Sequence, residues 1–303
     1  MKRIFYIILF FLVFFSCKQA HETTVIKQSK TGLIANHAMV VSARVEASKI
    51  GVDILKKGGN AFDAMAATGL ALAVSYPFAG NIGGGGFMVY RLSNGDIGGL
   101  DYREKAPMAA TKNMYLDEHG NVIPDKSTLG SLAVGIPGTI AGLFDIHEKF
   151  GSLPIKNIIE PVIALANKGV VVTENQAKRF NYYQAAFRLV NKDSLLFYKV
   201  WKENDTIKYP ALANTLERIL KNGRDEFYKG ETAKILVKFL QDNGAIITEE
   251  DLAKYEAKWR TPIIFNYDDL KVISMSPPSS GGICLAQIMK MIEPYDLSDY
   301  GHN

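Results

Sequence analysis

The residues whose types and spacing could best support binding or catalysis lie in one stretch, residues 80–107. It contains four consecutive glycines, residues 83–86, and an Arg103–Glu104 pair directly after a strand pattern. A guanidinium at the end of a strand can hold a substrate carboxylate through two parallel hydrogen bonds, a geometry that lysine cannot reproduce. The alternative role for Arg103 is a structural ion pair with Asp101, Glu104 or another acid, and the residues alone leave both roles open.

The glycine run does not have the context of a phosphate-binding loop. Such loops lead into a helix whose amide groups face the anion. Residues 83–86 instead lead into the strand pattern FMVYR, and no Gly-Lys-Ser/Thr follows. Consecutive glycines serve a turn with positive φ or a close approach of two backbones. We therefore expect a turn, either purely structural or forming the wall of a site, and no nucleotide site.

Other catalytic signatures are absent from the sequence. It has no G-x-S-x-G elbow and no S-x-x-K motif, so serine hydrolase and penicillin-binding chemistry have no support. The five histidines lack H-E-x-x-H spacing, so no metal site is predicted, and His147 is interpreted as a surface residue. Cys284 is expected to be a buried, small apolar residue and not a thiolate nucleophile. No cofactor is predicted.

The N-terminus has the pattern of a bacterial export signal. A positive pair precedes an apolar run, residues 4–15, which is shorter than the roughly 20 residues of a membrane-spanning helix. The small residue Ser16 then precedes Cys17. This junction predicts a lipoprotein signal peptide, residues 1–16, with Cys17 acylated at the start of a polar tether, residues 17–31. The lipid would anchor an exported protein to a membrane of the cell envelope; the alternative is a short N-terminal anchor with an incidental cysteine.

Net charge and cysteine count narrow the range of partners. The formal net charge is +4, and removal of residues 1–16 takes away two basic residues and no acid, which leaves +2. Nucleic-acid surfaces normally carry a concentrated basic patch, so no nucleic-acid partner is expected. Cys284 is the only cysteine besides Cys17, so lipidation of Cys17 excludes an internal disulfide and zinc binding by cysteine pairs.

Residues 32–303 are expected to form one compact α/β region. Helical spacing predicts a helix over 45–57 that Gly58-Gly59 ends, and a buried, alanine-rich helix over 61–74 with Asn60 as its N-cap. Two short strand patterns, 87–91 and 97–102, on either side of Ser93-Asn94-Gly95 predict a hairpin. The other predicted elements are helices at 137–150, 154–167, 212–221 and 231–243, strands at 262–266 and 271–274, a turn at Pro277-Pro278, and a last helix with Ser280 as its N-cap.

Seven blocks of this sequence resemble the gamma-glutamyltranspeptidase family in their order and spacing. They are GVDILKKGGNAFDAMAAT, GNIGGGGFMVY, LDYREKAP, SLAVGIPGTIAGLFDIHEKFGSLP, FYKG, ITEEDLAKY and PPSSGG, within residues 35–303. The resemblance implies the N-terminal-nucleophile hydrolase fold, an α/β sandwich of two sheets layered between helices (αββα), with only its large-subunit part present. It also implies that Arg103, in the family's D-[FY]-R-E stretch, binds the α-carboxylate of a γ-glutamyl group.

The same resemblance implies a proenzyme that cleaves itself into a large and a small subunit. A threonine at the start of the small subunit attacks a γ-glutamyl amide such as that of glutathione, and the glutamyl group passes to water or to an amino acid. The nucleophile is expected beyond Asn303, because Thr23-Thr24 lies in the tether and is not followed by the family's strand. No catalytic residue is therefore assigned in this chain, which is expected to be inactive without its small-subunit partner.

Two other interpretations stay open. The chain can be a non-catalytic remnant that binds a ligand or a partner without chemistry. It can also belong to a related acylase with another amide substrate, because acylases of cephalosporin side chains and of capsule polyglutamate share the scaffold.

Overall fold

A computed structural model of the chain describes residues 32–191 and 195–297. Contacts divide the chain into two units, residues 1–38 and 39–303. Of the first unit only residues 32–38 are described, and they contain no helix or strand. The predicted signal peptide, Cys17, the tether and Thr23-Thr24 lie outside the described residues. All that follows concerns the second unit.

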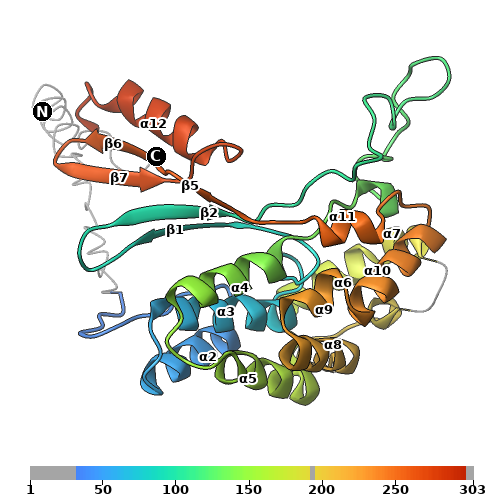
Figure 1. Cartoon of the computed structure of the whole chain (residues 1–303), viewed down its shortest axis with the longest axis horizontal. Coiled ribbons are helices and arrows are strands. Elements are labelled where there is room, and N and C mark those ends of the chain that lie inside the picture. The colour runs from blue at the N-terminus through green and yellow to red at the C-terminus, as the bar shows by residue number, and fades with distance from the viewer. Residues whose placement is uncertain (1–31, 192–194, 298–303) are drawn as a thin grey trace, which may run out of the picture. The chain divides into compact units, whose positions relative to one another are not determined.

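The second unit is a mixed helix and strand structure (Figure 1). Its helices are α2 (Val45–Lys56), α3 (Ala61–Ser75), α4 (Thr139–Phe150), α5 (Ile155–Lys168), α6 (Glu174–Tyr182), α7 (Gln184–Val190), α8 (Pro210–Asn222), α9 (Arg224–Tyr228), α10 (Glu231–Asp242), α11 (Glu249–Ala253) and α12 (Gly281–Ile292), with 3-10 turns η1 (Ser131–Ala133) and η2 (Leu196–Tyr198). Its strands are β1 (Phe87–Arg91), β2 (Ile97–Asp101), β3 (Val170–Val171), β4 (Thr206–Ile207), β5 (Lys258–Arg260), β6 (Ile263–Tyr267) and β7 (Leu270–Ser274). Among the described residues, no helix is long and apolar enough to cross a membrane.

The first two helices form as the sequence predicts. Gly58 follows α2 with a φ of +90°, a conformation that glycine adopts without steric cost. The Asn60 side chain accepts hydrogen bonds from the amides of Phe62 and Asp63, and the Asp63 carboxylate accepts one from the Asn60 amide. This capping box satisfies amides that otherwise lack partners at the start of α3. The predicted burial of α3 is confirmed, since most of its residues are buried.

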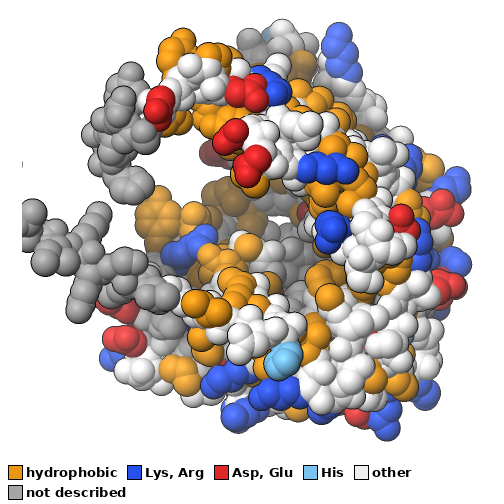
Figure 2. Space-filling view, turned by 90° about the vertical axis from the view of Figure 1, so that its left-hand side faces the viewer, with side chains coloured by type: hydrophobic (Ala, Val, Ile, Leu, Met, Phe, Trp, Pro, Cys, Tyr) orange, Lys and Arg blue, Asp and Glu red, His pale blue; other side chains and the backbone are white. Residues whose placement is uncertain are grey.

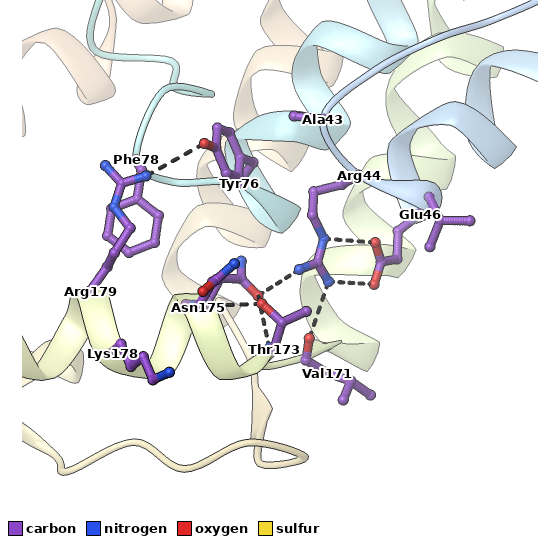
Figure 3. A pocket seen from close by; sticks show the side chains of 12 residues that line it. Ala43, Arg44, Glu46, Tyr76, Phe78, Val171, Thr173, Asn175, Lys178 and Arg179 are labelled. Carbon is purple, nitrogen blue, oxygen red and sulfur yellow. Dashed lines mark hydrogen bonds and ion pairs between the residues drawn. The ribbon is translucent and has the colours of Figure 1, made fainter. Parts of the chain in front are cut away.

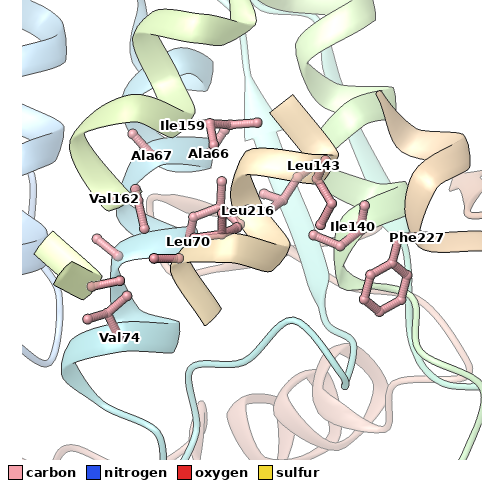
Figure 4. Close-up of a cluster of buried hydrophobic side chains, with 14 of the residues drawn as sticks. Ala66, Ala67, Leu70, Val74, Ile140, Leu143, Ile159, Val162, Leu216 and Phe227 are labelled. Atoms are coloured by element: carbon pink, nitrogen blue, oxygen red, sulfur yellow. The ribbon is translucent and has the colours of Figure 1, made fainter. Parts of the chain in front are cut away.

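The main hydrophobic core lies between helices. Helix α3 packs against α2, α4 and α5, and α5 packs against α8. Figure 4 shows side chains from α3, α4, α5, α8 and α9 in this core: Leu70, Ile140, Ile159, Leu216 and Phe227. Burying an aliphatic side chain of this size contributes about 1.5–3 kcal/mol. This core holds α3 and α4 in place beneath the strands that carry the candidate site.

The sheet that positions the candidate site has the strand order β1-β2-β5, all antiparallel. The β1–β2 hairpin runs from the pair Arg91–Ile97 at its turn to the pair Phe87–Asp101. Met88, Leu100 and Ile146 form a second buried cluster, which packs this sheet on α3 and α4. The predicted hairpin is confirmed, and it ends where the Gly83–86 turn and Arg103 begin.

A second hairpin, β6–β7, carries α12 on one side (Figure 1). Ser280 takes the N-cap position of α12, but its side chain makes no capping hydrogen bond. Its backbone is helical (φ −73°, ψ −18°), whereas a capping side chain needs an extended backbone. Ser279 provides the bond instead: its hydroxyl oxygen accepts from the Gly281 amide at 3.2 Å.

The prediction that Cys284 is buried was wrong. Its side chain is exposed, and Gly282 is the only buried residue of α12. The helix contacts β6 and β7 along one face, and none of the described residues covers the rest. An apolar sequence around a cysteine predicts burial, but it does not say which part of the protein supplies the cover.

Candidate functional site

Arg103 lies two positions after the last residue of β2, and its main chain is fixed on both sides. Its amide donates to Asp101 Oδ1 at 3.1 Å, and its carbonyl oxygen accepts from the Tyr255 hydroxyl at 2.8 Å. The preceding residue, Tyr102, extends the β1–β2 ladder through two hydrogen bonds with Gly86. The backbone at Arg103 is therefore held in one place while its side chain points away from it.

The Arg103 side chain is exposed and makes no hydrogen bond or ion pair within the described residues. The nearby buried carboxylate of Asp101 is bound by Arg260, whose Nε and Nη2 lie 2.8 and 2.7 Å from Asp101 Oδ2. The ion pair that the sequence left open for Arg103 with Asp101 is thus made by another arginine. This arrangement leaves the Arg103 guanidinium available for an external anion.

The glycine turn beside Arg103 is built on close approach, not on positive φ. None of residues 83–86 has a left-handed φ. A Cβ on Gly85 would lie 2.5 Å from the Tyr102 carbonyl oxygen and 2.8 Å from the Arg103 Cα. Only glycine lets the turn lie this close to the strand end, and the turn forms a wall next to Arg103.

The turn is also joined to the start of α4. The Gly84 carbonyl accepts from the amides of Gly138 and Thr139 at 2.7 and 3.0 Å. Asn81 Oδ1 accepts from the Gly84 amide at 2.6 Å and from the Thr139 hydroxyl at 3.0 Å. The first amides of α4 are therefore bound by the protein itself, so this helix N-terminus does not present them to a phosphate.

Tyr255 is a buried residue next to Arg103 that the sequence did not identify as part of the site. Its side chain is 2% exposed, and its ring stacks on Tyr228 with centroids 5.7 Å apart. The Lys105 ammonium lies 4.6 Å from the Tyr255 ring centroid and donates to the Glu256 carbonyl at 2.7 Å. Burial raises the pKa of Tyr255, so the phenol stays protonated and acts as a hydrogen-bond donor.

Helix α11 ends at Ala253 and places Tyr255 in contact with the main chain of Arg103. Thr248 and Asp251 form a capping box at its start. The other oxygen of Asp251, Oδ1, accepts from the Met108 amide at 2.7 Å. One carboxylate thus joins the chain that follows Arg103 to the helix that precedes Tyr255.

A cavity of ≈ 260 Å³ lies behind the glycine turn. Gly80, Asn81, Gly85, Tyr102 and Thr139 line it together with residues of α3 and α4. Its lining joins the turn, the end of β2 and the start of α4. The structure therefore brings the predicted glycine run and the strand end that carries Arg103 to one place.

A larger surface cavity, of ≈ 650 Å³, lies between the start of α2 and α6 (Figure 3). The Arg44 guanidinium in this cavity already has protein partners. It donates hydrogen bonds to both carboxylate oxygens of Glu46, to Gln176 Oε1 and to the Val171 carbonyl. Arg179 stacks over the Phe78 ring at 4.0 Å. Arg44 therefore has a structural role.

The remaining candidates have structural roles or lie elsewhere. His147 is half-buried, and its Nε2 lies 2.7 Å from the Leu153 carbonyl oxygen, so it joins the end of α4 to the next loop. Within residues 32–191 and 195–297, no group of three or more His, Cys, Asp or Glu side chains could hold a metal ion. Cys17 lies outside the described residues.

Comparison with known proteins decides the family. The model of the gamma-glutamyltranspeptidase family matches residues 47–303. The chain belongs to this family. It is 44% identical over 273 residues to the glutathione hydrolase proenzyme of Escherichia coli, covering 88% of this chain and 47% of that protein. The chain therefore spans about half the length of the curated relatives it matches.

Solved structures agree in fold. The gamma-glutamyltranspeptidase of Helicobacter pylori is 42% identical with a TM-score of 0.86, covering 90% of this chain and 79% of that chain. The enzyme from Pseudomonas nitroreducens, complexed with L-DON, is 44% identical with a TM-score of 0.80, covering 86% of this chain and 77% of that one. The predicted α/β class and N-terminal-nucleophile hydrolase fold are confirmed.

Three site features were missed by reading the sequence: the Asp101–Arg260 pair, Tyr255 and the bonds from Gly84 to the start of α4. A local signal existed only for α11, since T-E-E-D at residues 248–251 has the spacing of a capping box. The other two join segments far apart in the chain, and no local pattern indicates them.

Proposed function

We propose that this chain is the large-subunit half of a gamma-glutamyltransferase and glutathione hydrolase. The complete enzyme would transfer the γ-glutamyl group of glutathione, or of a related γ-glutamyl compound, to water or to an amino acid. Family membership supports this reaction, and the names of the relatives favour glutathione as a donor. Within the enzyme this chain would contribute substrate binding and would not contribute the nucleophile.

One observation carries the proposal: the Arg103 guanidinium is exposed and makes no hydrogen bond or ion pair with any residue that the structure describes. Its backbone is fixed, and the nearby carboxylate of Asp101 is already bound by Arg260. We assign Arg103 to the α-carboxylate of the γ-glutamyl group, which a planar guanidinium can grip at two points. A 4-aminobutanoyl group is the γ-glutamyl group without that carboxylate, and it has nothing to offer Arg103.

The partner in this proposal is the C-terminal half of the same enzyme. It would supply the threonine nucleophile and the groups that stabilise the oxyanion, without which the covalent route does not exist. The length of the relatives and the uncovered apolar face of α12 support such a partner. By "the complete enzyme" we mean this chain together with that half.

The test is turnover of a γ-glutamyl anilide. The complete enzyme should hydrolyse it and should hydrolyse the 4-aminobutanoyl anilide far less efficiently, while purified residues 18–303 should hydrolyse neither. Equal efficiency on the two anilides would remove Arg103 from its assigned role. Activity of residues 18–303 alone, free of contaminating enzyme, would overturn the need for the partner.

We also propose a membrane-anchored location in the bacterial cell envelope, through a lipid on Cys17. The motivation is the charged start, the short apolar run and the Ser16-Cys17 junction. Cys17→Ala should abolish incorporation of labelled fatty acid and leave an unprocessed or differently cut precursor. If the variant is still processed and fractionates with membranes as the parent does, the anchor is not Cys17.

A further inference from the structure

We propose that Tyr255 is a positioning residue for Arg103, and that its hydroxyl sets the affinity of the site for the substrate α-carboxylate. The inference rests on the proposed role of Arg103. It adds a residue about 150 positions away in the sequence, whose side chain holds the main chain of Arg103 and not its guanidinium.

Two hydrogen bonds hold the backbone of Arg103. Asp101 Oδ1 accepts from its amide at 3.1 Å, and the Tyr255 hydroxyl donates to its carbonyl at 2.8 Å. Gly85 approaches the Arg103 Cα from another side. Arg103 is exposed, and its long side chain has no partner within the described residues to fix it. The position of its guanidinium therefore depends on the main chain from which it starts.

Tyr255 is itself held by its neighbours. Its ring is enclosed by the stacked Tyr228 ring on one side and approached by the Lys105 ammonium at 4.6 Å. Tyr228 is fixed in turn, because its hydroxyl donates to the Pro137 carbonyl and accepts from the Ala141 amide, both at 3.0 Å. A donor held in this way defines a position for the carbonyl that accepts from it.

The surrounding backbone leaves space for the Tyr255 hydroxyl. A Cβ on Gly138 would clash with both the Tyr102 carbonyl oxygen and the Tyr255 hydroxyl. Glycine at the start of α4 is thus required where the phenol approaches the strand end. The hydrogen bond from the Tyr255 hydroxyl to the Arg103 carbonyl thus joins the chain after β2 to the chain after α11, next to the start of α4.

A positioning role makes a kinetic prediction that a purely structural role does not. The Tyr255→Phe substitution keeps the ring and its stacking but removes the donor. A hydrogen bond of this kind is worth about a factor of five. In the complete enzyme, Tyr255→Phe should lower kcat/KM for the γ-glutamyl anilide by about fivefold, mainly through KM. The 4-aminobutanoyl anilide, which has no α-carboxylate, should be affected much less.

The matched control is Tyr115→Phe. The Tyr115 hydroxyl also donates to a backbone carbonyl, that of Leu132, at 3.0 Å. This variant loses the same kind of bond but should leave both anilides unchanged. A double variant, Arg103→Lys with Tyr255→Phe, should be no worse than Arg103→Lys alone, because the hydroxyl acts only through the arginine.

The outcomes separate this inference from the proposed function. If Arg103→Lys weakens both anilides equally, Arg103 does not bind the α-carboxylate, and both proposals fail. Suppose instead that Arg103→Lys lowers kcat/KM mainly for the γ-glutamyl anilide. Only the role of Tyr255 then fails if Tyr255→Phe lowers kcat/KM equally for both anilides. It also fails if the loss from Tyr255→Phe multiplies the loss from Arg103→Lys in the double variant.

A second variant tests the inference in case Tyr255→Phe does not fold. Lys105→Met removes the cation beside the Tyr255 ring and the bond to the Glu256 carbonyl without opening the core. It should produce a smaller loss with the same selectivity for the γ-glutamyl anilide. If Tyr255→Phe does not fold and Lys105→Met shows no such selectivity, the inference is overturned.

Discussion

At the scale of single residues, the site depends on which arginine binds which carboxylate. Asp101 is buried and binds Arg260, so the guanidinium of Arg103, two residues further along the chain, has no ion-pair partner within the described residues. Arg260 is about one-third exposed and is held by two contacts to one oxygen, a stable arrangement for a carboxylate removed from water. The two arginines have the same chemistry, but Arg260 binds Asp101, whereas Arg103 has no such partner within residues 32–191 and 195–297.

Arg103→Lys should damage substrate binding far more than folding. Lysine keeps the charge but loses the two-point grip on a carboxylate. Losing one partner of a buried, hydrogen-bonded charge pair costs about 2–5 kcal/mol, and the conservative change should fall near about 2 kcal/mol, or more than tenfold in kcat/KM. Steady-state kinetics on the γ-glutamyl anilide, with thermal unfolding in parallel, measures both. A collapse in thermal stability with little kinetic selectivity would make Arg103 a structural residue.

At the scale of elements, the glycine turn and helix α11 hold the end of β2 from two sides. The turn approaches the backbone directly, and α11 carries Tyr255 to the Arg103 carbonyl. Neither element contributes a reactive group. Their effect on activity should therefore pass through the position of Arg103.

Gly85→Ala and Gly83→Ala form a matched pair for the turn. A methyl group on Gly85 would press on the backbone of residues 102–104, whereas one on Gly83 meets nothing within 4 Å. Overpacking of this kind costs about 1–3 kcal/mol, and an exposed substitution without contacts stays within about 0.5 kcal/mol. The free energy of unfolding, measured in urea, and kcat/KM of the complete enzyme should both fall for the Gly85 variant only. Equal behaviour of the two variants would show that the turn has room to adjust.

Asp251 should make the attachment of α11 sensitive to acid. Burial alone would raise the pKa of Asp251, but hydrogen bonds from the amides of Met108 and Thr248 and from the Thr248 hydroxyl outweigh burial, and the pKa lies below its usual value. A carboxyl whose folded pKa is depressed stabilises the protein above its unfolded pKa of about 3.9. That contribution is lost as the pH falls from there through the folded pKa.

Asp251→Asn should therefore lower the free energy of unfolding at neutral pH by about 1 kcal/mol, the typical value of a helix cap. The gap to the parent should narrow below about pH 4, where the parent carboxyl becomes protonated. Urea unfolding across this range measures the gap. Glu249→Gln, an exposed change in the same helical turn, is the control and should show neither effect. A gap that is constant with pH would contradict the ionised role of Asp251.

At the scale of the whole molecule, apolar side chains stay uncovered on the second hairpin and α12. Figure 2 shows hydrophobic side chains spread over one face of the molecule. The exposed residues of β6, β7 and α12 include Ile264, Leu270, Ile283, Ile288 and Met291. Large apolar side chains exposed together on neighbouring elements are typical of a surface that another chain covers. In the proposed enzyme the C-terminal half covers it.

Cys284 provides a direct measure of that cover. In residues 18–303 alone, a maleimide should label Cys284 at a rate close to that of the urea-unfolded chain, because the side chain is exposed. In the complete enzyme the labelling should be strongly slowed. The isolated chain should also bind an apolar dye, and Ile288→Ser with Met291→Ser should reduce that binding. Equal labelling rates with and without the C-terminal half would show that α12 is not part of the interface.

The sequence by itself determined the local elements and the family. Periodicity, Gly58 and the Asn60 cap indicated the first two helices, and the strand patterns around Ser93-Asn94-Gly95 indicated the β1–β2 hairpin, because each of these signals lies within a few neighbouring residues. It also identified the stretch that carries Arg103. The short elements α9, α11 and β5 escaped prediction, since three to five residues carry too little periodicity to distinguish them from loops.

Only the tertiary structure decided which residues meet. The pairing of Asp101 with Arg260, the bond from Tyr255 to Arg103 and the contact of Gly85 with the strand end join residues separated by up to about 160 positions. The apolar pattern around Cys284 suggested burial, but the described part of the chain leaves that residue exposed. A sequence pattern shows that a side chain needs a partner; which partner it receives depends on the packing of distant segments and, for α12, on cover from outside these residues.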